Sequence, residues 1–166
     1  ALKKHKDGKI IKRLLIEKVR SYGNQLWSGY AVLRNPITWK VVPDAEVYGI
    51  DISQYAIANS KPEIRNRLKI GNATQLPWPD NYFDLVISIT TLHNLHAYDL
   101  DKALREMERV STNHKYLCVE SYRNEEEKAN LLYWQVTCEA FNTPEEWRWW
   151  FKQTNYSGDY SFIFFE

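Results

Sequence analysis

Two polar positions in the middle of the chain follow apolar runs and could together bind a nucleoside. Asp51 closes the run 47–50, and Asn72 with Ala73 follows the short run 68–70. In open parallel sheets, ligands bind beyond the carboxyl ends of the strands. A carboxylate there can accept hydrogen bonds from both hydroxyls of a ribose, while an amide side chain and a backbone N–H can contact adenine. We therefore expect an adenosine-containing ligand. The alternatives are a helix-capping or solvated Asp51 and an ordinary Gly-Asn turn.

The elements that must position these residues alternate along the chain. Strands are predicted over 45–50, 68–70, 83–89 and 116–120, with helices from Ser53 to before Pro62 and through Leu100, Leu104, Met107 and Val110. A capping box from Thr143 to Glu146 opens a tryptophan-rich helix, and Tyr160–Phe165 is predicted as a last, antiparallel edge strand. This order predicts an α/β fold of Rossmann-like form, a mostly parallel sheet with helices on both faces.

Composition limits the classes of function. The chain has 166 residues, a net charge of +1 and 44% hydrophobic residues, which predicts one domain over 1–166 and gives no reason to expect a nucleic-acid partner. Two cysteines and no apolar run of about 20 residues predict a cytoplasmic protein with neither a metal site nor a membrane span. An amphipathic helix is predicted over 9–20, within a helical extension spanning 1–30. The oligomeric state is open.

Three motifs occur in order and together indicate a family. They are Gly49-Ile50-Asp51-Ile52-Ser53, the stretch from Gly71-Asn72-Ala73 through Leu76-Pro77-Trp78-Pro79-Asp80-Asn81 to Ser88, and Leu92-His93-Asn94-Leu95. Over roughly residues 41–122, the chain resembles the class I S-adenosylmethionine-dependent methyltransferases. The likeness is strongest to the small-molecule branch related to ubiquinone and menaquinone biosynthesis.

The resemblance implies a role for each matching residue. S-adenosylmethionine is the implied cofactor, with Asp51 on its ribose, Ile52 against adenine, Asn72 where the family commonly has Asp, Ala73 as a backbone contact to adenine, and Ile89 near its amino-acid end. The implied reaction is methyl transfer to an O, N or C nucleophile of a small molecule. His93 is the candidate general base, although a histidine that caps the next segment is an alternative. His96, Glu120 and Tyr122 are candidates for the substrate pocket.

One expected feature is missing. The family carries a glycine-rich loop about 18–20 residues before the ribose-binding acid, and that distance falls near 32–40, where this chain has no glycine. We expect a break in the chain between Tyr30 and Val42, with the loop left out of the printed sequence. Otherwise the protein lacks the motif, which would favour a non-catalytic binding module with a methyltransferase fold. An NAD-dependent oxidoreductase is a further alternative, against which the Leu76–Asn81 turn argues.

Overall fold

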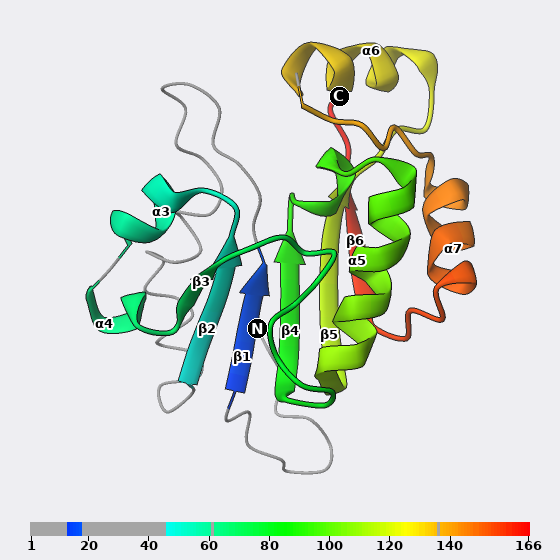
Figure 1. Ribbon diagram of the computed structural model, residues 1–166. Coiled ribbons are helices and arrows are strands. Elements are labelled where there is room, and N and C mark those ends of the chain that lie inside the picture. The colour runs from blue at the N-terminus through cyan, green and yellow to red at the C-terminus, as the bar shows by residue number, and fades with distance from the viewer. Residues whose placement is uncertain (1–12, 18–45, 61, 136) are drawn as a thin grey trace.

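The protein is built on one parallel sheet. The computed structural model describes residues 13–17, 46–60, 62–135 and 137–166 (Figure 1). Its strands are β1 (Arg13–Glu17), β2 (Glu46–Asp51), β3 (Leu68–Ile70), β4 (Phe83–Ile89), β5 (Ser111–Glu120) and β6 (Asp159–Ile163). They lie in the order β3-β2-β1-β4-β5-β6, and every neighbouring pair is parallel. All the carboxyl ends therefore meet at one edge.

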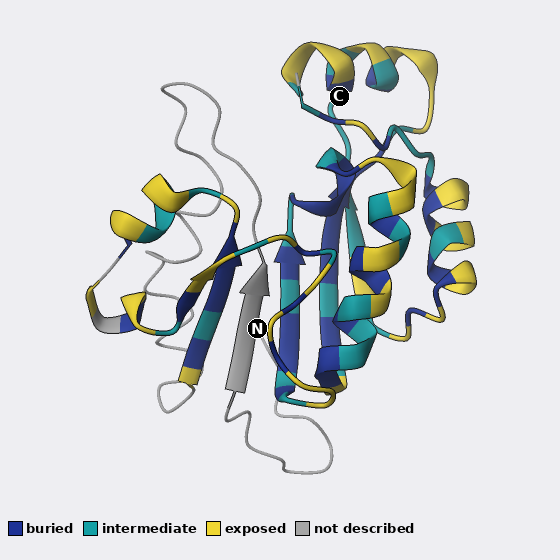
Figure 2. Ribbon diagram, in the orientation of Figure 1, coloured by how far each residue is buried: buried dark blue, intermediate teal, exposed yellow. Residues whose placement is uncertain are grey.

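The described helices lie on the flanks of the sheet and beyond its carboxyl edge. They are α3 (Gln54–Ala58), α4 (Pro62–Arg65), the 3₁₀ helix η1 (Leu92–Asn94), α5 (Ala97–Val110), α6 (Glu125–Trp134) and α7 (Pro144–Gln153). Figure 1 shows α5 and α7 together beside β4–β6, α3 and α4 near β2 and β3, and α6 beyond the carboxyl ends. The main core joins the sheet to α5 and α7 through fully buried side chains such as Phe83, Leu104 and Trp147. Figure 2 shows the buried residues concentrated in the central strands and along one side of α5 and α7.

The predicted α/β, Rossmann-like class is confirmed. β4 occupies the predicted range, because a stretch with five apolar residues among seven suits a strand that is covered on both faces. Ser53 caps α3 with its side chain, and the capping box between Thr143 and Glu146 is formed at the start of α7. The predicted strand over 116–120 is longer than expected, since β5 already begins at Ser111.

The helix predicted over 9–20 is wrong for residues 13–17, which form β1. This strand pairs with β2 on one side and with β4 on the other, at the centre of the sheet. The spacing of Leu14, Leu15 and Ile16 with their neighbours fits a helical face, but three consecutive apolar residues fit a buried strand equally well. Pairing on both edges decides in favour of the strand, because it satisfies the backbone groups on both sides.

The last strand was predicted to be antiparallel, and this is also wrong. β6 runs parallel to β5, with Tyr116 opposite Asp159 and Glu120 opposite Ile163. The reason lies in the connection between the two strands. α6 and α7 separate them, and α7 carries the chain back to the amino end of the sheet before β6 begins (Figure 1). A return of that kind produces a parallel neighbour, whereas an antiparallel one can follow a short hairpin.

The expected chain break between Tyr30 and Val42 lies outside the described residues. The position of β1 nevertheless changes where a glycine loop should be sought, which is directly after Glu17 instead of near 32–40. Residues 18–45 connect β1 to β2, a stretch longer than the dozen or so residues that a parallel crossover needs. That stretch contains Gly23 and Gly29 and no Gly-x-Gly sequence.

Candidate cofactor and active site

Asp51 is a buried carboxylate held at the carboxyl end of β2. Only 3% of its surface is exposed, and its Oδ1 accepts a hydrogen bond from the backbone N–H of Ser53 at 2.8 Å. Ser53 in turn caps α3 by accepting from the N–H of Ala56 at 3.2 Å. The carboxylate is thus oriented by the chain reversal that starts the helix. Asp51 therefore makes the local contact at the helix start that the sequence offered as an alternative. It also lies at the edge of the sheet where a ribose-binding acid is expected.

The turn after β3 lies against the same end of β2. The N–H of Gly71 donates to the carbonyl of Asp51 at 3.0 Å, and a Cβ at Gly71 would lie 2.8 Å from Cδ1 of Ile50, so glycine permits this close approach. Asn72 is exposed, and its Oδ1 accepts from the N–H of Thr74 at 3.0 Å. Asn72 therefore shapes the turn. Ala73 is buried at 2% exposure.

An exposed apolar surface accompanies Asp51. Ile52 is 38% exposed and Ile70 is 57% exposed, and Ile70 is the register partner of Asp51 across β2 and β3. Branched apolar side chains left in water at a strand edge suit contact with a flat aromatic ring. Ile52 was expected there from the sequence. Ile70 was not, because only the pairing register places it beside Asp51.

Arg109 braces the turn that carries the Leu-Pro-Trp-Pro-Asp-Asn motif. Its guanidinium donates to Asp80 at 2.8 Å and to the carbonyls of Trp78 at 2.9 Å and Leu76 at 3.0 Å. It also donates to Glu106 at 2.6 and 2.7 Å, and Glu106 accepts from the N–H of Leu76 at 2.7 Å. Hydrogen bonding to Glu106 raises the pKa of Arg109 above its ordinary value. The motif is thus a rigid turn fastened to α5.

The backbone is strained where β4 ends. Thr90 has a φ of 51°, a left-handed conformation that is unfavourable for a β-branched residue. Ile89 is half-buried, and its carbonyl accepts from the hydroxyl of Thr91 at 3.1 Å. The hydroxyls of Ser88 and Thr90 are buried and have no hydrogen-bond partner among the described residues. Two unsatisfied hydroxyls beside a strained turn mark this edge as a place for a polar ligand.

A histidine and a glutamate face one another beyond β4 and β5. His93 on η1 is 1% exposed, and its Nε2 lies 3.4 Å from Oε2 of Glu120, the last residue of β5, which is 2% exposed. Asn94 places its Nδ2 3.1 Å from the same ring nitrogen. Nδ1 of His93 is buried without a hydrogen-bond partner in the part of the chain that the structure describes. Both strands deliver their residue to the same edge, which explains the meeting of positions 93 and 120.

Burial changes the ionisation of both members of this pair. It raises the pKa of Glu120 from 4.5 to about 7, against the opposing effect of a hydrogen bond from Gln135. It lowers the pKa of His93 from 6.5 to about 4. Both shifts favour the neutral form of the residue. Between about pH 4 and 7 the pair is therefore mostly uncharged, and Glu120 is the group that ionises as the pH rises through about 7.

Comparison with known families decides the assignment. Residues 28–119, more than half of the chain, match the family described as a methyltransferase domain. The chain belongs to this methyltransferase domain family. The resemblance to class I methyltransferases found in the sequence is thereby confirmed.

Curated relatives of this methyltransferase domain point to the expected branch. The demethylmenaquinone methyltransferase of Geobacillus kaustophilus is 39% identical over 77 residues, which is 43% of this chain and 32% of that protein. The ubiquinone/menaquinone biosynthesis C-methyltransferase UbiE of Pasteurella multocida is 40% identical over 77 residues, which is 42% of this chain and 28% of that protein. The matched stretch therefore spans about a third of these relatives.

Solved structures agree on the fold. An S-adenosylmethionine-dependent methyltransferase from Archaeoglobus fulgidus superposes with a TM-score of 0.63 at 18% identity, over 87% of this chain and 60% of that one. The YcgJ protein from Bacillus subtilis gives a TM-score of 0.61 at 18% identity, over 88% and 62% of the two chains. At these identities, the likeness establishes the architecture of the methyltransferase domain alone.

The remaining predicted substrate residues lie apart from the buried pair of the methyltransferase domain. The side chain of His96 is 55% exposed, with its Nδ1 3.5 Å from Oε2 of Glu139 and its ring stacked on Tyr98. Tyr122 is half-buried, and the ammonium of Lys128 lies 5.2 Å from its ring centroid. Of the three predicted substrate residues, Glu120 alone joins His93. His96 and Tyr122 belong to more exposed surroundings.

Sequence reasoning missed the residues that surround the pair from the segment after α6. Gln135 donates to Glu120, and Thr137 donates to Asn94. Burial, with a smaller contribution from the charge of Glu120, raises the pKa of Cys138 to about 12. No motif marks these positions. The described residues hold no group of three or more His, Cys, Asp or Glu placed to bind a metal. They also include no helix that is long and apolar enough to cross a membrane.

Proposed function

We propose that this protein transfers a methyl group from S-adenosylmethionine to a small-molecule acceptor. The observation that carries the proposal is the alignment of Asp51, the Asn72–Ala73 turn and the end of β4 along one edge of the sheet, within a methyltransferase domain match. Ligands of open parallel sheets bind at this edge. The motifs that predicted the family are the same segments that the fold brings there.

The residues at the edge fit the cofactor. The buried carboxylate of Asp51 suits a pair of ribose hydroxyls, and exposed Ile52 offers an apolar surface to adenine, with Asn72 and the backbone of Ala73 beside it. The unsatisfied hydroxyls of Ser88 and Thr90 lie at the strand end where Ile89 would adjoin the amino-acid part. When bound, S-adenosylmethionine supplies a methyl group that is activated by its sulfonium.

The pair of His93 and Glu120 would handle the proton of the acceptor. Oδ1 of Asn94 accepts from Thr137, so the amide N–H of Asn94 can donate to Nε2 of His93, which places the hydrogen of the neutral ring on Nδ1. Oε2 of Glu120 lies 3.4 Å from Nε2 and makes no hydrogen bond among the described residues. Below about pH 7, Glu120 holds its own proton, and once ionised it can take a proton from an acceptor group beside His93. Base catalysis by the pair would therefore switch on as Glu120 ionises.

The relatives suggest which acceptor to test first. Several are named demethylmenaquinone methyltransferases, which favours a quinone-type ring as the small molecule. We place its reacting group at His93 and its outer parts near His96 and Tyr122, whose more exposed positions suit a bulky substituent. Incubation of the protein with labelled S-adenosylmethionine and a demethylmenaquinone analogue, followed by mass and NMR analysis of the product, identifies the atom that accepts the methyl group.

Binding of the cofactor can be tested without the acceptor. We expect isothermal titration calorimetry to show binding of S-adenosylmethionine and of its demethylated product. Replacement Asp51→Asn should weaken both by about 10–100-fold, since it removes a charged acceptor of two hydrogen bonds. Asp101→Asn, which changes a half-buried carboxylate on α5, is the matched control and should leave affinity unchanged. Affinity for NAD in place of S-adenosylmethionine, or equal affinity in Asp51→Asn, would refute the assignment.

A second candidate is a methyltransferase-fold module that binds a partner or ligand without catalysis. It is favoured by one observation, the lack of any Gly-x-Gly sequence between β1 and β2. Such glycines let a backbone approach a cofactor closely. This candidate predicts no measurable binding of S-adenosylmethionine in the same titration, by a protein that is otherwise folded.

A further inference from the structure

The segment that follows α6 contacts the buried pair of His93 and Glu120 and the neighbouring Asn94. The Nε2 of Gln135 donates to Oε1 of Glu120 at 2.7 Å, and the hydroxyl of Thr137 donates to Oδ1 of Asn94 at 2.8 Å. The backbone N–H groups of Glu139 and Ala140 both donate to the carbonyl of His93 at 2.9 Å. A single stretch of chain thus fixes residues that come from two separate elements, η1 and β5.

Of the residues in this segment, Gln135 is the one whose backbone is fixed by a helix. It is the C-cap of α6, and its backbone N–H donates to the carbonyl of Leu131 at 2.9 Å, so the last turn of the helix sets where its side chain begins. Leu131 is fully buried. The side-chain amide therefore reaches Glu120 from a rigid base.

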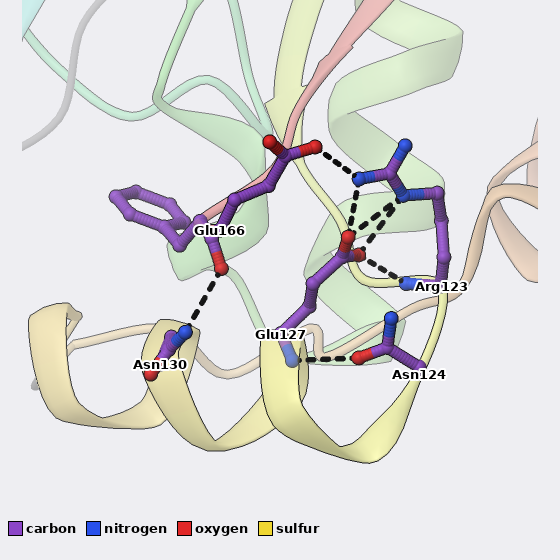
Figure 3. Close-up of polar contacts among 6 residues, drawn as sticks. Arg123, Asn124, Glu127, Asn130 and Glu166 are labelled. Atoms are coloured by element: carbon purple, nitrogen blue, oxygen red, sulfur yellow. Dashed lines mark hydrogen bonds and ion pairs between the residues drawn. The ribbon is translucent and has the colours of Figure 1, made fainter.

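α6 itself is fastened to the end of the chain. Arg123 bridges Glu127 and Glu166 with its guanidinium, which lies 2.6 Å from Oε1 of Glu166 (Figure 3). The Nδ2 of Asn130 donates to the carbonyl of Phe165 at 3.2 Å, and the ring of Trp134 stacks on that of Phe165. These contacts hold both ends of the helix, including the turn that presents Gln135.

Among the described residues, few groups lie close enough to Glu120 to influence its charge. His93 faces it from η1, and Cys138 lies near it as a neutral thiol, with Glu139 further along the same segment. From α7, Trp147 donates its indole N–H to the backbone carbonyl of Glu120 at 3.0 Å and not to the carboxylate. Among the described residues, Gln135 is the group whose hydrogen bond to the carboxylate lowers the pKa of Glu120.

We propose that Gln135 is a positioning residue, which orients the Glu120 carboxylate toward His93 and stabilises its ionised form. Its amide donates to one carboxylate oxygen, so the other is turned to the imidazole. A donor to a carboxylate favours the charged state, while burial opposes it. The use of this pair as a proton acceptor rests on the proposed function, but the link between Gln135 and Glu120 does not.

The test measures the titration of Glu120 directly. Carbon-13 NMR of labelled glutamate side chains, with the Glu120 signal assigned by its loss in Glu120→Gln, gives the pKa in each variant without any substrate. Gln135→Leu removes the donor at similar size, and we expect the pKa of Glu120 to rise by about one to two pH units. Gln135→Lys replaces the donor by a charged one, and we expect the pKa to fall below that of the wild type.

Opposite shifts in the two variants separate positioning from a packing role, since simple disruption would move the pKa in the same direction in both. Tyr133→Ala, at an 87% exposed position near the same helix end, is the control and should leave the titration unchanged. An unchanged pKa in Gln135→Leu, or a rise in Gln135→Lys, would overturn the proposal. Failure to bind S-adenosylmethionine would instead count against the proposed function and leave the titration readable.

Discussion

Glu120 has a raised pKa and His93 a lowered one, and we predict that their opposite effects on the pH dependence of stability cancel in the wild type. Glu120 has a raised pKa, so its contribution to stability is present below 4.5, its ordinary value, and is lost as pH rises through about 7. His93 has a lowered pKa, so its contribution is present above 6.5 and is lost as pH falls through about 4. Between pH 4.5 and 6.5, the two contributions change in opposite directions and largely cancel in the wild type.

Replacing one of the two residues should reveal the pH dependence of stability that the other contributes. Each group contributes a slope of about 1.4 kcal/mol per pH unit where it titrates in one state alone, or about 3 kcal/mol over its full window. In Glu120→Gln, which can still accept from Gln135, the free energy of unfolding should therefore climb by nearly that amount relative to wild type as pH rises from 4.5 to about 7. In His93→Gln it should fall over the same range.

The measurement is urea unfolding followed by tryptophan fluorescence at half-unit pH steps, with each variant compared with the wild type at the same pH. The comparison removes the titration of groups shared by both proteins. Glu126→Gln, an exposed change on α6, is the control and should give a flat difference, because its carboxylate remains in water. Difference curves for Glu120→Gln and His93→Gln that are both flat, or that slope the same way, would refute the reasoning.

Two further predictions concern the supports of the site. Arg109→Met should reduce the free energy of unfolding by about 2–4 kcal/mol, since it removes the bonds that hold the 76–80 turn, while the exposed Arg105→Met should cause no measurable change. Thr90→Gly should stabilise the protein by about 1 kcal/mol by relieving a left-handed β-branched residue, while Thr91→Gly, at a φ of −120°, should destabilise it. Both are measured by urea unfolding, and a loss of stability in Thr90→Gly would show that its backbone is not strained.

The sequence predicted those parts of the fold whose patterns admit one structure. The run 83–89 is too apolar for a surface element and became β4, and the capping box formed at α7. α6 went unpredicted, because its apolar residues are consecutive and show no helical period, although Asn124 accepts from the N–H of Glu127 as an N-cap. The direction of β6 depends on the path of α7 across the sheet, which no local pattern encodes.

The candidate site was likewise predictable from the sequence only in part. Asp51 and Asn72 follow strands that the pattern shows, so their place at the carboxyl edge could be foreseen. His93 and Glu120 were each named, but their contact depends on β4 and β5 being neighbours. Gln135 had no signal at all. A glutamine near a helix end is common, and its contact with Glu120 joins positions 15 residues apart through tertiary structure alone.

The surroundings of Asp51 and of Glu120 also differ in which parts of the chain hold each carboxylate in place. Around Asp51, local turns supply the hydrogen bonds, so the position of this carboxylate is set once β2 and β3 pair. Around Glu120, the supports come from α6 and the segment after it, which Arg123 and Asn130 anchor to the end of the chain. Loosening α6 should therefore disturb the proton-handling pair while leaving Asp51 in place. We therefore expect cofactor binding and proton handling to be separable, with substitutions at Asp51 changing the first and substitutions at Gln135 changing the second.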